Sequence, residues 1–452
     1  MARSPSSSLY TQLVVSLLFP LHEKLKKHHS THLLKQLEAS QWLPVEALNS
    51  AQDHDLQKFI AHLYQHNPYY RDLMQQRQLT PDAISNIQDL IKLPFLTKSI
   101  IREHQQKLIS RHSDPLLQYN TGGSSGEPLI FYMGMDRVSH DVAAKWRATR
   151  WWGVDIGDVE AVIWGSPIEL NKQDRVKLWR DRLFRSHLIP AFELGKDNIE
   201  RYLKKLVTLK PAMVFGYPSV IYLLVQQAQQ QGIDLSRLGV KVVFTTSEML
   251  YPHQRELIEQ QFGAPVANGY GARDAGFIAH QCPQGSLHIS SEHILVEIID
   301  PQGKPLPAGE TGEIVTTHLA TTGFPFVRYR TGDMGRLATT PCSCGRTLPV
   351  LEEVSGRSTD FLTATDGAKV HALALIYVLR EIDGMEQFKI TQHSATKVTV
   401  LVMLQAPDSS LLKTISDRLK QRLGDDMEIT ITPCTQIPTS PNGKFRYVES
   451  HI

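Results

Sequence analysis

The sequence is poor in cysteine, lacks a long hydrophobic run and carries little excess charge. Four cysteines in 452 residues do not form the disulfide framework of a small secreted protein. The apolar stretch LVVSLLFPL at 13–21 is shorter than the ~20 residues that span a bilayer, and it lacks the small-residue cleavage site of a signal peptide. These absences favour a cytoplasmic protein.

The charge balance excludes a second class of function. Lysine and arginine total 48 and aspartate and glutamate total 46, so the net charge is only +2. A nucleic-acid-binding protein would carry a basic stripe, which is missing here. One local basic segment, HEKLKKHHSTH at 22–32, is typical of a solvated helix face. Peripheral contact with a membrane surface is the alternative for this segment.

Alternating runs predict an α/β fold. From 158 to 263, strand-like runs such as DVEAVIWG and VKVVFTT alternate with helix-like runs such as NIERYLKKLVTL, which is typical of a mainly parallel sheet wrapped by helices. Residues 1–110 are expected to be mostly helical and 285–350 to form a more antiparallel subdomain. The last ~95 residues resemble a small α+β unit. We therefore expect an N-terminal domain at 1–355 and a C-terminal domain at 356–452.

The stretch TGGSSGEP at 121–128 places three glycines and two serines directly before an apolar run. Unhindered backbone N–H groups and short hydroxyls can surround a phosphate chain. The P-loop pattern GxxxxGK[ST] does not fit, because Gly122 and Gly126 are separated by three residues and Glu127 stands where the lysine would be. An ordinary turn is the alternative to a phosphate loop.

Five motifs, in order along the chain, resemble those of adenylate-forming enzymes, which activate carboxylic acids as acyl-AMP. TGGSSGEP resembles the phosphate loop of that family, and YRTGD at 329–333 its ribose-binding motif. NGYGARDAG, GRSTDF and PNGKFR resemble the aromatic-Gly-x-x-Glu stretch, the interdomain hinge and the C-terminal Gly-Lys segment. HNPYYRDLM, LPFLTKSIIREH and CSCGRTLP are similar to phenylacetate–CoA ligases and the related capsule-biosynthesis (CapK-like) branch.

The resemblance implies both a fold and an activity. The fold would be a large N-terminal α/β body of several subdomains with a small, mobile α+β lid. The activity would be ATP-dependent and Mg²⁺-dependent formation of an acyl-AMP from an aryl or arylacetic acid, with release of pyrophosphate. Transfer of the acyl group to coenzyme A would follow. The alternatives are transfer to an amine in polysaccharide or secondary-metabolite biosynthesis, and a catalytically inactive, zinc-stabilised relative.

By this resemblance the nucleotide would be held by several motifs. Asp333 would accept hydrogen bonds from both ribose hydroxyls, and Tyr270 would border the adenine. Asp274 would take the metal-binding role that glutamate usually holds in the family, although it is one methylene shorter. Lys444 would be the main catalytic charge, reaching the acyl carboxylate and the α-phosphate. The other candidate nucleotide contacts are Thr121, Gly122, Gly123, Ser124, Ser125, Gly126, Ser247, Asn268, Gly271, Arg357 and the hinge residue Asp360.

Three groups of residues carry further expectations. Ser247, with Trp164 and Tyr217, follows a strand-like run where an acyl pocket could form. Glu127 receives no role, because a carboxylate beside a triphosphate is repelled unless it points away. Three cysteines and a histidine fit a closed, structural zinc site, with His280 as an alternative fourth ligand and free thiols as an alternative to zinc. The proposed ligands are Cys282, His288, Cys342 and Cys344.

Overall fold

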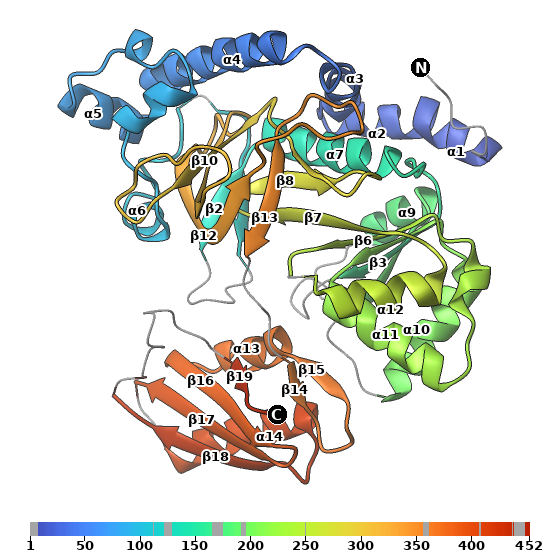
Figure 1. The fold of residues 1–452 in the computed structure, drawn as a ribbon. Helices are drawn as coiled ribbons and strands as arrows, with labels where there is room; N and C mark the ends of the chain where they lie inside the picture. The colour runs from blue at the N-terminus through green and yellow to red at the C-terminus, as the bar shows by residue number, and fades with distance from the viewer. Residues whose placement is uncertain are drawn as a thin grey trace.

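Figure 1 shows a large body that contains an extended sheet and a smaller C-terminal unit that lies beneath it. This mixed architecture confirms the predicted α/β class. The computed structural model describes residues 8–111, 113–121, 129–164, 175–190, 196–248, 250–355, 361–405, 408–435, 437 and 448–452.

Helices dominate the first part of the chain, as predicted. Pro68 separates two of them because it starts a new helix at its first position, where the Asn67 side chain accepts a hydrogen bond from the Tyr70 N–H group. Among the described residues, no helix has the length and apolar character needed to cross a membrane. The elements are α1 (Leu9–Leu13), the π-helix η1 (Val14–Leu18), α2 (Phe19–Leu25), α3 (Ser30–Ser40), α4 (Val45–His66), α5 (Pro68–Gln76), η2 (Pro81–Ala83), η3 (Ile87–Lys92) and α6 (Lys98–Glu103).

The predicted parallel sheet and its helices are present. Its central strands β5 and β6 are buried along their whole length, which explains why they are continuous apolar runs rather than alternating ones. The parallel strands are β3 (Glu160–Trp164), β4 (Ser186–Pro190), β5 (Met213–Gly216), β6 (Val242–Thr246) and β7 (Val266–Ala272). The helices are α7 (Met135–Arg150), α9 (Arg175–Leu183), α10 (Lys196–Leu209), α11 (Pro218–Gln230), η4 (Leu235–Leu238) and α12 (Pro252–Phe262).

The antiparallel strands continue the same sheet instead of forming a subdomain of their own. Eleven strands run in the order β10-β11-β12-β13-β9-β8-β7-β6-β5-β3-β4. Strands β9 to β12, within 285–350, pair antiparallel as expected. Antiparallel pairing also occurs before residue 285, because β7 already turns back into β8 at a tight turn where Gly276 has φ +97°. The added strands are β8 (Gly276–Gln281), β9 (Leu287–Ile289), β10 (Ile294–Ile299), β11 (Thr311–His318), β12 (Phe326–Leu337) and β13 (Val350–Ser355).

A single short contact joins the two halves of this sheet. Strand β13 pairs with β9 through two residue pairs, Val350 with His288 and Leu351 with Leu287. Neighbouring pairs are longer; β10 and β11, for example, share six. Strands β10 to β13 are therefore attached to the other seven strands, which include antiparallel β8 and β9, by the pairing with the fewest residue pairs along this part of the sheet.

The C-terminal unit has the predicted small α+β character. Its sheet has the order β18-β17-β16-β19, and Val398, Val400 and Val402 of β17 are buried at alternate positions. The domain boundary at 355/356 borders residues outside the described ranges and stays a prediction. The elements are β14 (Phe361–Thr363), β15 (Lys369–His371), α13 (Ala372–Arg380), β16 (Met385–Ser394), β17 (Lys397–Leu404), α14 (Ser409–Leu423), β18 (Glu428–Pro433) and β19 (Val448–Ser450).

Candidate functional site

A separate two-stranded hairpin frames the glycine-rich stretch. Strand β1 (Leu117–Asn120) pairs with β2 (Ile130–Met133), and Thr121 closes the end of the pair. Its N–H group donates to the Leu129 carbonyl at 3.0 Å, and its Oγ1 accepts from the Leu129 N–H group at 3.0 Å. The two residues that flank the predicted loop, Thr121 and Leu129, are therefore hydrogen-bonded to each other. Its residues Gly122, Gly123, Ser124, Ser125 and Gly126 lie outside the described ranges, as do Arg357, Asp360 and Lys444.

Two Tyr-x-x-x-Asp segments meet and exchange hydrogen bonds. Tyr270, on β7, donates its hydroxyl to Asp333 Oδ2 on β12 at 3.1 Å. Tyr329, on β12, donates its hydroxyl to Asp274 Oδ2 in the β7–β8 turn. The structure thus brings together residues about sixty positions apart, and each motif supplies the donor for the carboxylate of the other.

The electrostatic setting keeps Tyr270 a donor. Burial raises its pKa well above the usual range, and the negative charge of Asp333 raises it further. The phenol therefore stays protonated at any physiological pH. Asp333 is only half-buried, so its carboxylate is also within reach of a ligand.

Asp274 lies deeper than a surface metal ligand. The residue is buried, its Oδ1 accepts from the Ala275 N–H group at 3.1 Å, and its Oδ2 accepts from Tyr329. A carboxylate has about four lone-pair sites, so each oxygen keeps one for a further partner. A cation at Asp274 would have to approach these remaining positions.

Sequence reasoning missed Arg137, which fixes the turn that carries Asp274. Its Nη1 and Nη2 donate to the carbonyls of Asp274 and Arg273, each at 3.3 Å, and its Nε donates to Asp141 Oδ2 at 2.9 Å. Arg273 in turn donates to the Asn120 carbonyl at 3.2 Å, next to the glycine-rich stretch. The only sequence signal was the i,i+4 spacing of Arg137 and Asp141, which is typical of surface ion pairs.

A buried His–Asp–His group lies behind this turn. One ligand atom each of His140, Asp141 and His318 falls within a sphere that could surround a metal ion. However, His318 Nδ1 accepts from the Ala320 N–H group at 3.3 Å, so in the neutral ring the hydrogen is on Nε2. That is the atom facing Asp141 Oδ1 at 3.9 Å. A nitrogen that carries its hydrogen offers no lone pair to a metal ion, and 3.9 Å is too long for a hydrogen bond to Asp141.

The residues expected around an acyl pocket lie at the carboxyl ends of three neighbouring strands. Trp164 ends β3 and Tyr217 follows β5, and their rings stack with centroids 4.5 Å apart and planes 21° apart. Ser247 follows β6 and has φ +73°, a backbone conformation that residues other than glycine rarely adopt. It lies one position beyond Thr246, which pairs with Gly269 beside Tyr270.

Three cysteines and His288 form a compact cluster. Cys282 Sγ is 3.7 Å from Cys342 Sγ, and Cys344 Sγ is 3.2 Å from His288 Nε2. All four candidate ligand atoms lie within 4.8 Å of one another. Cys282 and His288 belong to the β8–β9 segment, and Cys342 and Cys344 precede β13. The cluster therefore spans the short β9–β13 contact.

The protonation of His288 suits a metal ligand. Its Nδ1 is 3.2 Å from the Leu348 carbonyl, which can only accept, so Nδ1 carries the hydrogen and Nε2 presents a lone pair to the cluster. Burial lowers the pKa of His288 to about 4, and the ring is neutral near pH 7. The alternative ligand His280 lies outside this group and packs against the rings of Phe244 and Phe277.

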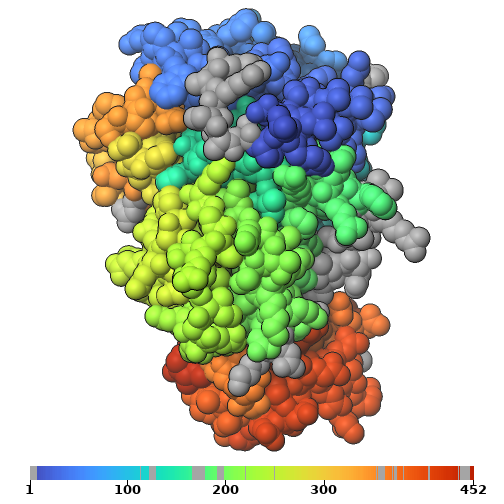
Figure 2. All heavy atoms as spheres, turned by 90° about the vertical axis from the view of Figure 1, so that its right-hand side faces the viewer, coloured from blue at the N-terminus to red at the C-terminus, as the bar shows by residue number. Residues whose placement is uncertain are grey.

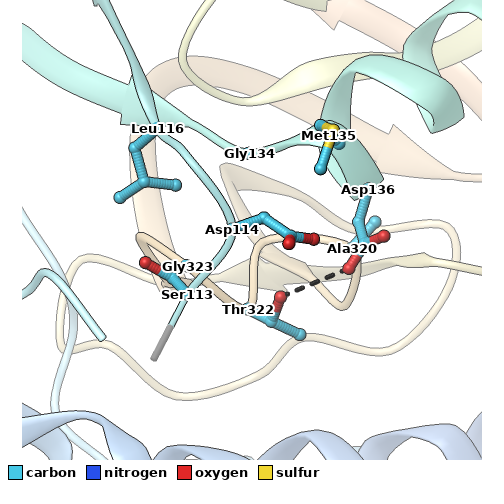
Figure 3. A pocket seen from close by; sticks show the side chains of 9 residues that line it. All are labelled: Ser113, Asp114, Leu116, Gly134, Met135, Asp136, Ala320, Thr322 and Gly323. Carbon is cyan, nitrogen blue, oxygen red and sulfur yellow. Dashed lines mark hydrogen bonds between the residues drawn. The ribbon is translucent and has the colours of Figure 1, made fainter. Parts of the chain in front are cut away.

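A pocket elsewhere takes no part in the site. Figure 3 shows it at the start of α7, where Thr322 Oγ1 donates to Asp136 Oδ2 at 3.4 Å. Leu116 and Gly134 lie just beyond the pair Leu117–Met133, at the end of the hairpin opposite Thr121. The lining residues are Ser113, Asp114, Leu116, Gly134, Met135, Asp136, Ala320, Thr322 and Gly323.

Comparison with known proteins gives consistent matches. Residues 184–322 match the family described as AMP-binding enzyme, and residues 362–451 match the CapK C-terminal domain. Protein CapK of Staphylococcus aureus is 23% identical over 99% of this chain and 98% of its own. The phenylacetate-coenzyme A ligases of Thermus thermophilus and Pseudomonas putida are 24% and 26% identical, over 90% and 91% of this chain and 97% and 96% of theirs.

A solved structure shares the fold. The 2-hydroxyisobutyryl-CoA ligase in its thioesterification state, in complex with 2-HIB-AMP and CoA, gives a TM-score of 0.65 at 23% identity. The match covers 90% of this chain and 91% of that protein.

The tight β7–β8 turn generates a prediction about Gly271. A Cβ at this position would lie 2.3 Å from the Gly276 carbonyl oxygen, a backbone atom that cannot move without opening the turn. We expect Gly271→Ala to lower the free energy of unfolding by more than about 2 kcal/mol, measured by denaturant unfolding. The matched control is Gly232→Ala, which has φ +66° and open space around the new methyl group. The free energy of unfolding of this control should fall by only ~1 kcal/mol. Equal losses in both variants would contradict this account of Gly271.

Proposed function

Because this chain belongs to the adenylate-forming superfamily, in the branch of CapK and the phenylacetate–CoA ligases, we propose that it activates a carboxylic acid with ATP and transfers the acyl group to coenzyme A. The intermediate is an acyl-AMP, and pyrophosphate is the first product. The observation that carries this proposal is the convergence of Thr121 with the segments of Tyr270 and Asp333. Thr121, Tyr270 and Asp333 come from distant parts of the chain, and hydrogen bonds from Arg273 and Tyr270 link their segments.

The described residues suggest how ATP is held. Asp333 accepts the ribose hydroxyls with the carboxylate that Tyr270 orients, because a carboxylate has acceptor positions left after one hydrogen bond. Arg273 is an exposed cation fixed at the base of the glycine-rich stretch, where the triphosphate lies in this proposal. Asp274 holds Mg²⁺ directly or through water, since oxygen ligands suit this ion. Asn268 and Gly271 shape the strand beside the adenine.

The chemistry requires charge neutralisation more than a strong base. The acid and the α-phosphate are both anionic, so their approach is limited by repulsion and alignment. In this proposal Lys444 brings a positive charge to both groups for the first half-reaction. Rotation of the C-terminal domain about Asp360 then turns a different face of that domain toward the active site for thioester formation. Arg357 contacts the ribose side.

An aromatic acid is the substrate class that the described pocket residues favour. The stacked rings of Trp164 and Tyr217 offer a flat apolar wall at the carboxyl ends of β3 and β5, beside Ser247. Aromatic rings pack well against such a wall, in stacked or edge-on arrangements. Two relatives are named for phenylacetate and coenzyme A, which agrees with this choice. Transfer to an amine is the alternative for the second step.

The cysteine cluster is proposed to hold a structural Zn²⁺. Three thiolates and one imidazole complete a tetrahedral set and leave no open position for catalysis. The ligands come from both sides of the two-pair contact between β9 and β13. Zinc would therefore reinforce the joint between the two halves of the sheet.

The activity is tested with a panel of carboxylic acids in an assay for acid-dependent pyrophosphate release. We expect release with aryl or arylacetic acids, and thioester when coenzyme A is supplied. Parallel reactions with hydroxylamine and other amines distinguish an amide ligase from a thioester ligase. Lys444→Ala should abolish release of pyrophosphate and still convert supplied acyl-AMP to thioester. Lys397→Ala, on the exposed face of β17, is the matched control. Wild-type protein that releases no pyrophosphate with any acid would contradict the proposal and favour an inactive relative.

The ribose contact is tested by Asp333→Asn. The amide retains one acceptor oxygen and loses the charge, and a hydrogen bond to a charged group contributes about 1.5–3 kcal/mol. We expect KM for ATP to rise about 10- to 100-fold with little change in KM for the acid. Tyr270→Phe removes only the orienting donor and should raise KM for ATP less. A fall in kcat without any change in KM for ATP would refute this role of Asp333.

The zinc site is tested by metal analysis of protein purified without chelators. We expect about one zinc per chain, with loss of the metal in Cys342→Ser. The free energy of unfolding should fall in this variant by at least ~2 kcal/mol, because the binding energy of a structural metal is folding energy. Cys434→Ser, outside the cluster, should keep both metal and stability. Wild-type protein with far less than stoichiometric zinc would remove the site.

A further inference from the structure

The N-terminal helix, formed by α1, η1 and α2 without a break, is apolar on two opposite faces. One face is part of the protein interior: Val14 is fully buried and Phe19 is 6% exposed, in a cluster with Leu34, Ala143 and Ile156. The other face consists of leucines at every fourth position that point to solvent. Their exposed fractions are 86% for Leu9, 43% for Leu13, 55% for Leu17, 52% for Leu21 and 77% for Leu25.

The helix geometry aligns these leucines into one ridge. A spacing of four exceeds the 3.6 residues of an α-helical turn, so the side chains would drift gradually around a regular helix. The π-helical segment Val14–Leu18 has more residues per turn, and it reverses this drift in the middle of the ridge. Five leucines over sixteen steps give a ridge about 24 Å long. A monomeric protein seldom exposes such a continuous apolar surface without a partner.

A second element extends the apolar surface. Trp179 and Leu183 of α9 are 72% and 43% exposed. Helix α9 is attached to the N-terminal helix, because the Tyr10 hydroxyl donates to the Leu183 carbonyl at 2.8 Å and the Arg185 guanidinium lies 4.1 Å from the Tyr10 ring centre. Figure 2 shows the N-terminal segment and the 175–190 segment next to each other on one face.

The exposed charges of the N-terminal helix itself are of one sign. Lys24, Lys26 and Lys27 are exposed at its C-terminal end, and Arg182 is exposed on α9. The one acidic residue between 8 and 32, Glu23, is 3% exposed and accepts hydrogen bonds from Ser30 and His22 on the buried side. The N-terminal helix therefore combines apolar side chains with cations and presents no exposed carboxylate. On α9, the partly exposed Asp181 is paired with Arg180 at 2.6 Å.

We propose that this leucine ridge, together with Trp179 and Leu183, docks on the surface of an anionic lipid bilayer. An amphipathic helix lying in the headgroup region buries its apolar face and attracts anionic lipids with its lysines. Tryptophan is enriched at the same depth. A second copy of the chain would fit less well, because its ridge offers no carboxylate to these lysines. The inference is independent of the proposed enzymatic function.

The test is cosedimentation of the full chain with vesicles. We expect binding to vesicles of 30% phosphatidylglycerol in phosphatidylcholine, much weaker binding to pure phosphatidylcholine, and release by high salt. The ridge variant Leu13→Gln/Leu17→Gln/Leu21→Gln should bind at least tenfold more weakly. Its matched control, Ile91→Gln/Val207→Gln, changes exposed apolar residues on other elements and should bind like wild type.

A charge variant separates the electrostatic contribution to lipid binding from the apolar contribution. Lys24→Gln/Lys26→Gln/Lys27→Gln should also lose at least tenfold in binding and should become insensitive to salt, whereas Lys204→Gln/Lys397→Gln/Lys413→Gln should not. The melting temperature should be unchanged in the ridge variant, because these leucines are exposed. Absence of wild-type binding to the anionic vesicles would overturn the proposal. So would a wild-type dimer that the ridge variant converts to a monomer, since the face would then belong to a second copy.

Discussion

The site depends on the reciprocal pair of hydrogen bonds between Tyr270 and Asp333 and between Tyr329 and Asp274. Each bond places a carboxylate by means of a phenol that belongs to the other segment, so neither segment can shift without disturbing both. The environments of the two carboxylates differ, because Asp274 is buried and Asp333 is half-buried. The same crossed arrangement thus gives one carboxylate a mainly internal set of partners and leaves the other accessible to a ligand.

The sheet supports this arrangement, and its shortest strand pairing is spanned by both the crossed hydrogen bonds and the cysteine cluster. Tyr270 on β7 and Asp333 on β12 lie on opposite sides of the contact in which β9 and β13 share only two residue pairs, so the crossed bonds span that contact. The cysteine cluster bridges that joint from one side. Arg137 stabilises the β7–β8 turn through backbone carbonyls, and its own charge is balanced by Asp141. Polar contacts thus hold the segments of the site in place relative to one another.

Much of the fold could be predicted because its signals are local. The buried alternation of β17 and the apolar runs of β5 and β6 lie in consecutive residues, and so do the motifs of the site. The role of Arg137 could not be predicted, since its partners are the carbonyls of a turn 136 and 137 positions away. The choice between His280 and His288 also required coordinates, because both are short distances from Cys282 in sequence. The continuity of the sheet was hidden for the same reason: strand order depends on contacts between distant segments.

In the proposed reaction, the charges of the described residues leave part of the charge neutralisation to other groups. Two carboxylates, Asp274 and Asp333, face a region that is proposed to receive a triphosphate and a further carboxylate. Among the described cations at this turn, Arg137 is committed to Asp141 and two carbonyls, and Arg273 donates to Asn120. Anions brought together in a partly buried site repel one another strongly unless cations neutralise them. In the proposed function, a bound Mg²⁺ and Lys444 would supply that charge when the substrates are in place.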